Sequence, residues 1–288
     1  MREQIQVFDP RQTMSRPNFE IFHYQEPHSS NVEMHHHDFY EIFFFLNGRV
    51  EYRVEGRIYH LQPGDLLLIN PMELHQLIAE PGDTTYERFV LWIEKEYLER
   101  LSTDMVSLTR CFDNTQPGHS NLLRPGHASH ANILMQFKEI VRESYGREYG
   151  NELYARSALL RLMVELNRLA INTGREMVSY EESSPLISNV LLYIGDHYDK
   201  PLSLEMLSQK FYVSKYHLSH EFSRIVGTSI YRYIMLKRLV MARQMLSNGI
   251  APGTVSISCG FSDYSNFYRA FRAQYGISPG VCAVRDIP

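Results

Sequence analysis

The sequence contains few cysteines and no long apolar run. Its three cysteines, Cys111, Cys259 and Cys282, are an odd number without the spacing of a metal site, so we expect free thiols in a reducing cytoplasm rather than a disulfide framework. No apolar stretch approaches the ~20 residues that a membrane-spanning helix requires, and residues 1–6 lack the apolar core of a signal peptide. These absences argue against a secreted or membrane protein, and we expect a cytoplasmic one.

Low-complexity tracts are also missing. With 44% hydrophobic and 22% charged residues, the composition is typical of a folded protein, and 288 residues suffice for two domains. The net charge of −4 is unevenly divided, because residues 185–288 hold 11 Lys+Arg and 6 Asp+Glu (net +5), whereas residues 1–184 hold 18 and 27 (net −9). The basic excess is therefore confined to the last third of the chain, as an electrostatic footprint for nucleic acid would be.

An irregular arm over residues 1–30 is expected to lead into a β domain. The aromatic-rich residues 41–46 end at an Asn47-Gly48 turn, which favours a hairpin. Several short strands with regular turns predict a small sandwich or barrel over about residues 19–93. The predicted strands lie near residues 19–24, 41–46, 50–55, 58–61, 66–69 and 86–93.

Three histidines and a glutamate form a candidate metal site. His35 and His37 are two residues apart, so on a strand they would share a face; Glu41 keeps that parity, and His75 could come across from a neighbouring strand. By the same parity His36 is expected to face outward. Three imidazoles and a carboxylate suit a divalent ion such as Zn, Ni, Mn or Fe.

The spacing His-x-His-x3-Glu-x6-Gly, followed by a glycine-aspartate pair and His75, resembles the two motifs of the cupin fold, whose metal-binding members use those four positions. The second motif departs from the cupin pattern, because Asn70 and Met72 stand where proline and glycine are usual. The cluster could equally bind a polar small molecule through hydrogen bonds, or pair internally. Tyr52 and Trp92, the single tryptophan, are further candidates for a ligand pocket, since aromatic faces stack on sugar rings, although a buried core tryptophan is the default interpretation.

Apolar residues recur at helical spacing over residues 129–172, with a break at residues 146–150. The second helix is apolar on more than one face, so it could cover the barrel and also pack on a second subunit. The polar residues 173–184 are predicted to be a linker. These boundaries divide the chain into domains at 1–172 and 185–288.

The same helical device occurs twice between Ser203 and Gly276. Each copy has a short helix, predicted at residues 204–211 and 254–261, a tight turn, a capped second helix and a glycine stop. With an offset of 49 residues, the apolar pair Leu218 and Phe222 coincides with Phe267 and Phe271, which are four apart and predict a narrow buried stripe. Residues 229–246 are predicted to form a connector helix that packs between the two copies and leaves Lys237, Arg238 and Arg243 for solvent or phosphate.

The opposite faces of the second helices carry polar and cationic side chains, as base edges and phosphates require. Residues 203–285, and above all the strings 260–267 and 275–279, are similar to the DNA-binding domain of the AraC/XylS family of transcription regulators. The resemblance implies base contacts by Tyr216, Ser219, His220, Tyr264, Ser265, Asn266 and Arg269. Lys215, Arg224 and Arg272 are better interpreted as phosphate contacts.

The resemblance implies a two-domain α+β fold: an N-terminal cupin-like β-barrel with a helical pair, and a C-terminal all-α domain. It also implies a homodimer on paired DNA sites, activation through RNA polymerase, and a small-molecule effector, with a sugar or related carbon source favoured. His35, His37, Glu41, Tyr52, His75 and Trp92 would bind the effector. No cofactor is required, although a divalent metal could occupy His35, His37, Glu41 and His75. The alternatives are a cupin metalloenzyme using those four residues, and a regulator whose β domain only dimerises.

Overall fold

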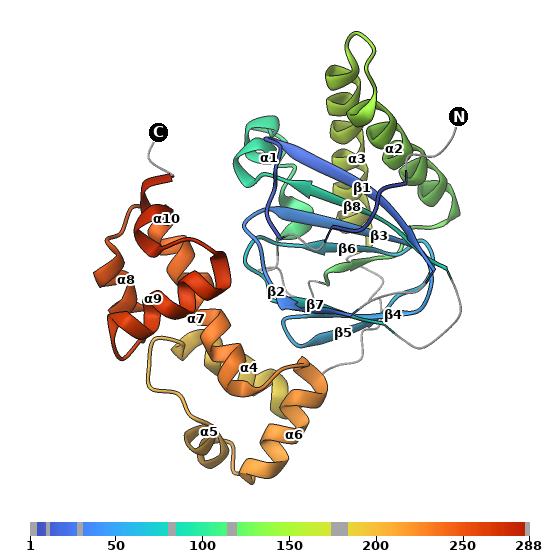
Figure 1. Ribbon diagram of the computed structural model, residues 1–288. Helices are drawn as coiled ribbons and strands as arrows, with labels where there is room; N and C mark the ends of the chain where they lie inside the picture. The colour runs from blue at the N-terminus through green and yellow to red at the C-terminus, as the bar shows by residue number, and fades with distance from the viewer. Residues whose placement is uncertain are drawn as a thin grey trace. The chain divides into compact units, whose positions relative to one another are not determined.

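The computed structural model describes residues 5–9, 12–27, 31–79, 85–113, 120–173 and 184–285, and the chain forms two compact units. The first is built from two β-sheets and the helices α1 to α3; the second consists of helices α4 to α10 (Figure 1). The predicted two-domain α+β class is thereby confirmed. No helix in the described part of the chain is long and apolar enough to cross a membrane.

The strands of the first unit lie in two sheets. The five-stranded sheet has the order β1-β8-β3-β6-β9, with β1 Phe19–Glu26, β8 Tyr86–Ile93, β3 Tyr40–Asn47, β6 Leu66–Ile69 and β9 Leu122–Leu123. The four-stranded sheet has the order β2-β7-β4-β5, with β2 Val32–His35, β7 His75–Ala79, β4 Val50–Val54 and β5 Arg57–His60. Neighbouring strands such as β1 and β8 pair antiparallel. The two sheets face each other and enclose a hydrophobic core (Figure 1).

The five-stranded sheet is covered on both faces, which explains its continuous apolar strands. On β3, Ile42 and Phe44 belong to the core beneath the helices, whereas Phe43 and Phe45 belong to the core between the sheets. Alternation along a strand thus sends successive aromatic side chains into two different cores.

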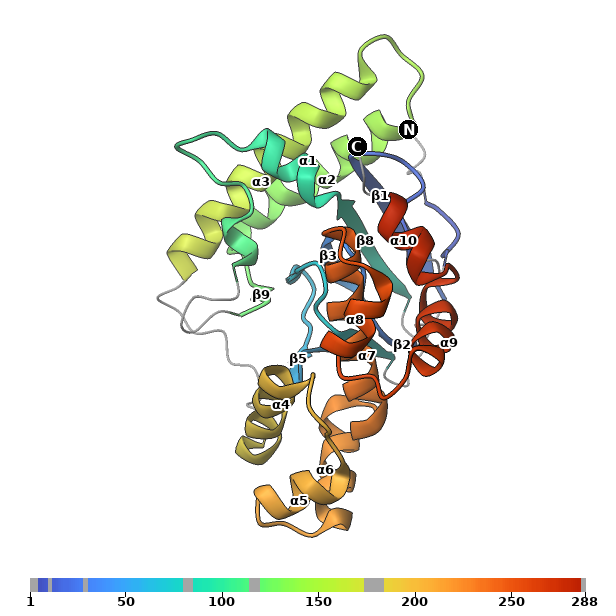
Figure 2. The same cartoon turned by 90° about the vertical axis from the view of Figure 1, so that its left-hand side faces the viewer.

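Two long helices provide the outer layer. α2 (His127–Tyr145) and α3 (Asn151–Thr173) lie side by side over the five-stranded sheet (Figures 1 and 2). Side chains such as Phe137 and Leu162 are fully buried against that sheet. The shorter α1 (Lys95–Leu101) and a 3-10 turn at Arg110–Phe112 complete this core.

The second unit contains the doubled motif as two helix-turn-helix pairs joined by a connector. Its helices are α4 Pro185–His197, α5 Leu204–Lys210, α6 Lys215–Val226, α7 Ile230–Ser247, α8 Pro252–Ser258, α9 Tyr264–Tyr275 and α10 Pro279–Arg285. The second helices, α6 and α9, begin and end with an offset of 49 residues. Ser214 and Asp263 accept hydrogen bonds from the backbone N–H three residues later, and Gly227 and Gly276 end the helices at φ 83° and 71°.

The first helices differ from the prediction. α5 ends at Lys210 and α8 spans Pro252–Ser258 rather than 254–261, because Pro252 occupies the first turn, where its missing N–H costs nothing. The first helices of the two copies, α5 and α8, are therefore offset by 48 residues. The same offset relates the two turn residues with positive φ, Tyr212 at 54° and Gly260 at 76°. The second turn is one residue longer than the first, with Ser262 as the additional residue, so the offset becomes 49 at the second helices.

Candidate functional site

The polar face of α9 is open to solvent. Phe267 and Phe271 are fully buried, so the opposite side of the helix carries the groups predicted to contact DNA. The exposed residues are Tyr264, Ser265, Asn266, Arg269 and Arg272.

The polar face of α6 has the same orientation relative to its buried pair, Leu218 and Phe222. Tyr216 is 81% exposed and its ring stacks on that of His220, with centroids 6.1 Å apart. Ser219 is half-buried, so its hydroxyl is less accessible than either ring.

The predicted phosphate contacts on α6 lie beside acidic residues. Arg224 forms an ion pair with Glu221 at 2.9 Å, and Lys215 lies 3.5 Å from Glu205. Because both cations are exposed, these ion pairs are weak and can exchange for phosphate.

The connector arginine Arg238 has a structural role. Its guanidinium donates to the carbonyl oxygens of Tyr198 at 2.8 Å and Lys200 at 2.7 Å, so it anchors the segment between α4 and α5. The expectation that Arg238 is left for solvent or phosphate is therefore wrong. Burial lowers the pKa of Arg238 from its ordinary value, and the side chain remains cationic.

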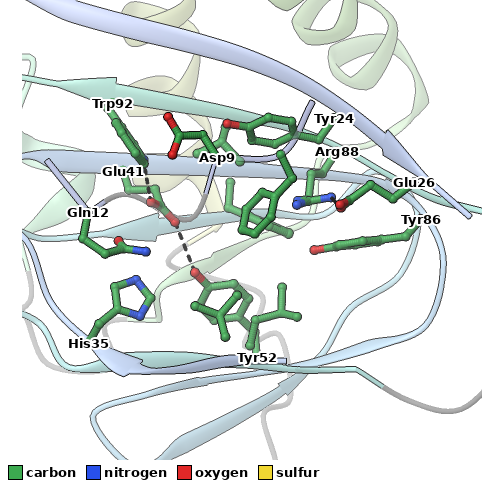
Figure 3. A pocket seen from close by; sticks show the side chains of 15 residues that line it. Asp9, Gln12, Tyr24, Glu26, His35, Glu41, Tyr52, Tyr86, Arg88 and Trp92 are labelled. Atoms are coloured by element: carbon green, nitrogen blue, oxygen red, sulfur yellow. Dashed lines mark hydrogen bonds and ion pairs between the residues drawn. The ribbon is translucent and has the colours of Figure 1, made fainter. Parts of the chain in front are cut away.

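A cavity that opens to solvent lies between the two sheets of the first unit (Figure 3). Four of the predicted ligand-binding residues line it: His35, Glu41, Tyr52 and Trp92. His37 and His75 are fully buried and are not part of the lining. Several polar and aromatic residues that were not predicted from the sequence also line the cavity, namely Phe8, Asp9, Gln12, Tyr24, Glu26, Tyr86 and Arg88.

The strand β8 carries a sequence signal for three of the lining residues. Tyr86, Arg88 and Val90 alternate with the same parity as Trp92 along β8, so a strand whose Trp92 points inward also turns Arg88 and Tyr86 inward. Tyr24 lies opposite Arg88 on β1. Phe8, Asp9 and Gln12 precede the first strand and follow no strand or helix periodicity, so the sequence gives no signal that they line the cavity.

Glu41 forms the polar centre of the cavity wall. One carboxylate oxygen accepts from the Tyr52 hydroxyl at 3.1 Å and the other from the Trp92 indole N–H at 2.8 Å (Figure 3). Burial by itself would raise the pKa of Glu41, but the hydrogen bond and charge of His37, helped by His75, outweigh burial and lower it to about 2. Glu41 is thus a fixed negative charge beside the cavity.

Arg88 is the principal cation of the cavity. It is 4% exposed, pairs with Glu26 at 2.7 Å and lies over the rings of Tyr24 and Tyr86 at 4.8 and 4.1 Å. Among the described residues, the buried hydroxyl of Tyr86 has no hydrogen-bond partner. A ligand hydroxyl or water in the cavity would satisfy this hydroxyl.

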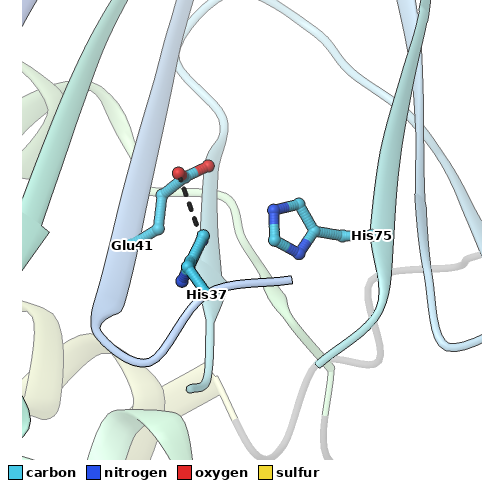
Figure 4. Close-up of side chains that lie close together, drawn as sticks. All are labelled: His37, Glu41 and His75. Carbon is cyan, nitrogen blue, oxygen red and sulfur yellow. Dashed lines mark ion pairs between the residues drawn. The ribbon is translucent and has the colours of Figure 1, made fainter. Parts of the chain in front are cut away.

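Behind the cavity, His37, Glu41 and His75 converge so that one possible ligand atom from each lies within 4.8 Å of the others (Figure 4). The Nδ1 atoms of His37 and His75 contact the carbonyl oxygens of Phe39 at 2.9 Å and Glu73 at 2.8 Å. A carbonyl only accepts, so Nδ1 carries a proton in both rings, and Nε2 of His37 faces the Glu41 carboxylate at 3.4 Å (Figure 4).

Two features of the predicted four-residue cluster need correction. β2 ends at His35 and β3 begins at Tyr40, so the chain crosses from one sheet to the other between them and strand parity does not apply there. His36 is consequently buried, at 3% exposure, and does not face outward as expected. His35 lies outside the converging three residues; its ring centroid is 4.1 Å from that of His75, and its side chain lines the cavity.

A β unit with an enclosed polar cavity, joined to a doubled helix-turn-helix, defines a DNA-binding regulator that carries its own ligand-binding domain. A family model of the AraC-like ligand binding domain matches residues 18–163, and a model of a helix-turn-helix domain matches residues 207–283. The chain therefore belongs to the AraC/XylS family of transcription regulators.

The chain is similar to the HTH-type transcriptional activator RhaS of Escherichia coli O139:H28, with 24% identity over 246 residues that cover 85% of each protein. Similar solved structures include the C-terminal domain of AraT from Geobacillus stearothermophilus, with 23% identity over 38% of this chain and 91% of that chain and a TM-score of 0.36. They also include unsaturated fatty acid bound ToxT from Vibrio cholerae, with 13% identity over 94% of this chain and 96% of that chain and a TM-score of 0.41.

Proposed function

We propose that this regulator is a transcriptional activator whose DNA binding responds to a sugar or related carbon source in the cavity of the β unit. The observation that carries the proposal is that one chain combines this polar, aromatic cavity with two solvent-facing helices that present DNA-binding groups. The similarity to RhaS, a transcriptional activator, supports the activating role.

The cavity chemistry supports a polyhydroxylated ligand. Trp92 is among the aromatic side chains that line the cavity, and aromatic surface of this kind packs against sugar rings. Glu41 and Arg88 supply an acceptor and donors for its hydroxyl groups, and the buried Tyr86 hydroxyl still needs a partner. A buried hydroxyl left unsatisfied costs about 1–3 kcal/mol, which a ligand hydroxyl would recover.

The experiment is a thermal-shift screen of the full chain against neutral aldoses and ketoses, followed by DNA binding with each sugar that stabilises the protein. Tyr86→Phe, which removes only the hydroxyl, is expected to weaken the shift, whereas Tyr231→Phe changes an exposed tyrosine of the helical unit and serves as control. Stabilisation by aromatic or fatty acids, with no response to any sugar, would contradict the sugar assignment.

On DNA, α6 and α9 are proposed to enter successive major grooves about 34 Å apart. The proposed base contacts are Tyr216, Ser219, His220, Tyr264, Ser265 and Arg269, and the proposed phosphate contacts are Lys215, Arg224 and Arg272. Asn266, the remaining predicted base contact, is hydrogen-bonded to Arg269. Arg269 is the strongest candidate for direct readout, because a guanidinium can grip guanine through two hydrogen bonds. RNA polymerase is the proposed target of the DNA-bound activator.

The outer face of α3 is the proposed homodimer surface. Leu153 and Ile171 are 68% and 52% exposed, and Leu160 and Val164 lie between them on the half-buried side of the helix. The spacing of seven, four and seven residues is that of a helix pair packed through one seam. Such a dimer would place two helical units on paired sites.

We further infer that His37, Glu41 and His75 can hold a divalent metal such as Zn, although regulation does not require one. Their fit rests on the Nε2 atoms of both histidines, which are buried: that of His75 has no hydrogen-bond partner among the described residues, and that of His37 faces the Glu41 carboxylate at 3.4 Å. Their Nδ1 contacts to backbone carbonyls are the arrangement that metal-ligating histidines adopt. A bound metal would link the two sheets by joining His75 on β7 to Glu41 on β3.

Metal analysis of the purified full chain, with melting curves after zinc addition, tests this inference. His75→Asn should abolish both the metal content and the stabilisation, and His127→Asn, at an exposed histidine, should preserve them. Equal metal content in the two variants would overturn it.

The alternative of a cupin metalloenzyme using His35, His37, Glu41 and His75 gains less support, because such an enzyme gives the helix-turn-helix unit no role. Turnover of candidate isomerase or dioxygenase substrates by the metal-loaded chain, lost in Glu41→Gln, would favour it.

A further inference from the structure

The groups around Arg269 differ between the two helix-turn-helix pairs. Asp263, which caps α9, and Asn266 and Arg269 within it are exposed, follow one another at intervals of three residues and are joined by hydrogen bonds. The corresponding residues of α6 are Ser214, His217 and His220, which contain no carboxylate, amide or guanidinium. We propose that Asn266, itself held by Asp263, positions Arg269 for base recognition and does not read a base. This inference rests on the proposed function of Arg269 as a base contact.

Asp263 has two separate roles. One of its carboxylate oxygens accepts from the backbone N–H of Asn266 at 2.8 Å and caps α9. The other accepts from the side-chain amide nitrogen of Asn266. Because a carboxylate only accepts, this contact determines which end of the Asn266 amide faces Asp263.

The amide oxygen of Asn266 therefore faces Arg269 and accepts from its Nη2 at 2.6 Å. Both ends of the amide are engaged within the helix, so a base edge would have to displace one of these hydrogen bonds. Asn266 was predicted as a base contact in its own right; its geometry favours a positioning role.

Arg269 retains its recognition groups in this arrangement. Its Nε approaches the carbonyl oxygen of Ser265 at 3.4 Å and one Nη2 hydrogen is used by Asn266. Of the five guanidinium N–H groups, three remain, two at Nη1 and one at Nη2. One from each nitrogen provides the two donors that guanine O6 and N7 require. Holding the side chain before binding reduces the rotamer entropy lost on the DNA.

Among the residues that the structure describes, the first pair has no comparable series of hydrogen bonds. Its exposed rings, Tyr216 and His220, stack on each other. We therefore expect the second pair to discriminate one base pair sharply and the first pair to tolerate several bases.

The test is selection of binding sites by the full-length protein from a pool of random DNA duplexes, repeated with variants. Arg269→Ala should lose a strong preference for one G·C pair, by about 10-fold or more. Asn266→Ala should reduce the preference at that same pair by about 5-fold, as expected for one hydrogen bond. Preferences elsewhere and binding to unselected DNA should be unchanged.

Asp263→Ser separates capping of α9 from positioning of Asn266. Serine caps α6 at the equivalent position, so the melting temperature should be retained. The hydrogen bond to the Asn266 side-chain amide is lost, so the preference at the same G·C pair should fall. If Arg269→Ala removes that preference while Asn266→Ala and Asp263→Ser leave it intact, or if Asn266→Ala relaxes a different base pair, the positioning role is wrong. If Arg269→Ala changes no preference, the proposed base contact itself is wrong.

Discussion

At the scale of single residues, the turns of the two helix-turn-helix pairs use the same backbone conformation for different reasons. Tyr212 adopts φ 54° with its side chain in solvent, so the cost is conformational only. At Gly260, φ is 76° and a Cβ atom would lie 2.6 Å from the carbonyl oxygen of Asp199. Glycine is therefore required there both by conformation and by the close approach of a backbone.

Gly260→Ala should destabilise the helical unit by roughly 3 kcal/mol, since it adds a backbone clash to the cost of positive φ. Gly249→Ala is the matched control: φ is 78° but nothing lies within 4 Å of an added Cβ, so a loss of about 1 kcal/mol is expected. Urea unfolding of the two full-length variants measures the difference, and equal losses would show that the contact with Asp199 is unimportant.

The histidines of the β unit predict a pH dependence of stability. Burial lowers the pKa of His35 to about 4, and that of His75 also falls well below its ordinary value. Both side chains therefore bind protons more readily in the unfolded chain, so stability is complete above about pH 6.5 and falls as pH decreases towards 4. Melting curves at pH 7.5 and 5 should show this fall.

The fall should be smaller in His35→Asn, whose side chain does not titrate. His60→Asn, at an exposed histidine, should behave as wild type. A wild-type slope in His35→Asn would mean that the titration of His35 contributes nothing to stability.

At the scale of elements, α7 carries cationic side chains with different tasks from those of α9. Arg238 on α7 is bonded to two backbone carbonyls, whereas Arg272 on α9 is exposed near the reading face. Burial of the guanidinium, rather than charge or sequence position, separates the two roles.

Arg238→Ala should lower the melting temperature of the helical unit by removing two hydrogen bonds from a charged donor, a loss of about 2 kcal/mol. The slope of log K against log salt for DNA binding should be unchanged. Arg272→Ala should do the opposite: the melting temperature stays, and the slope becomes shallower by about 1. A shallower salt dependence of DNA binding in Arg238→Ala would instead show that Arg238 contacts phosphate, as predicted from the sequence.

At the scale of the whole molecule, the proposed dimer would place two helical units on one DNA. The proposed dimer surface on α3 can be tested without damaging the core, because Leu153 and Ile171 are already exposed. Leu153→Asp with Ile171→Asp should convert a dimer into a monomer and lower affinity for paired sites more than for a single site. The control is Tyr149→Asp, a fully exposed residue before α3. Identical sedimentation of both variants and wild type would contradict this surface.

Local patterns determined the architecture to a large extent. The caps Ser214 and Asp263 and the glycine stops Gly227 and Gly276 act within one turn of their own helices, so the sequence predicts both recognition helices and their offset. The strand at residues 41–46 was equally predictable, because its apolar run follows from burial on both faces.

Only the tertiary structure decided which side chains share a site. Asp9, Glu26, Tyr52 and Arg88 line one cavity although they come from separate segments, because antiparallel pairing and the facing of two sheets bring distant positions together. His36 and His37 are both buried because the chain crosses between sheets there, which no period reveals. The spacing of apolar residues along a helix or strand shows which of its faces is buried. A site, by contrast, is formed by contacts between helices and strands, which depend on how the whole chain packs.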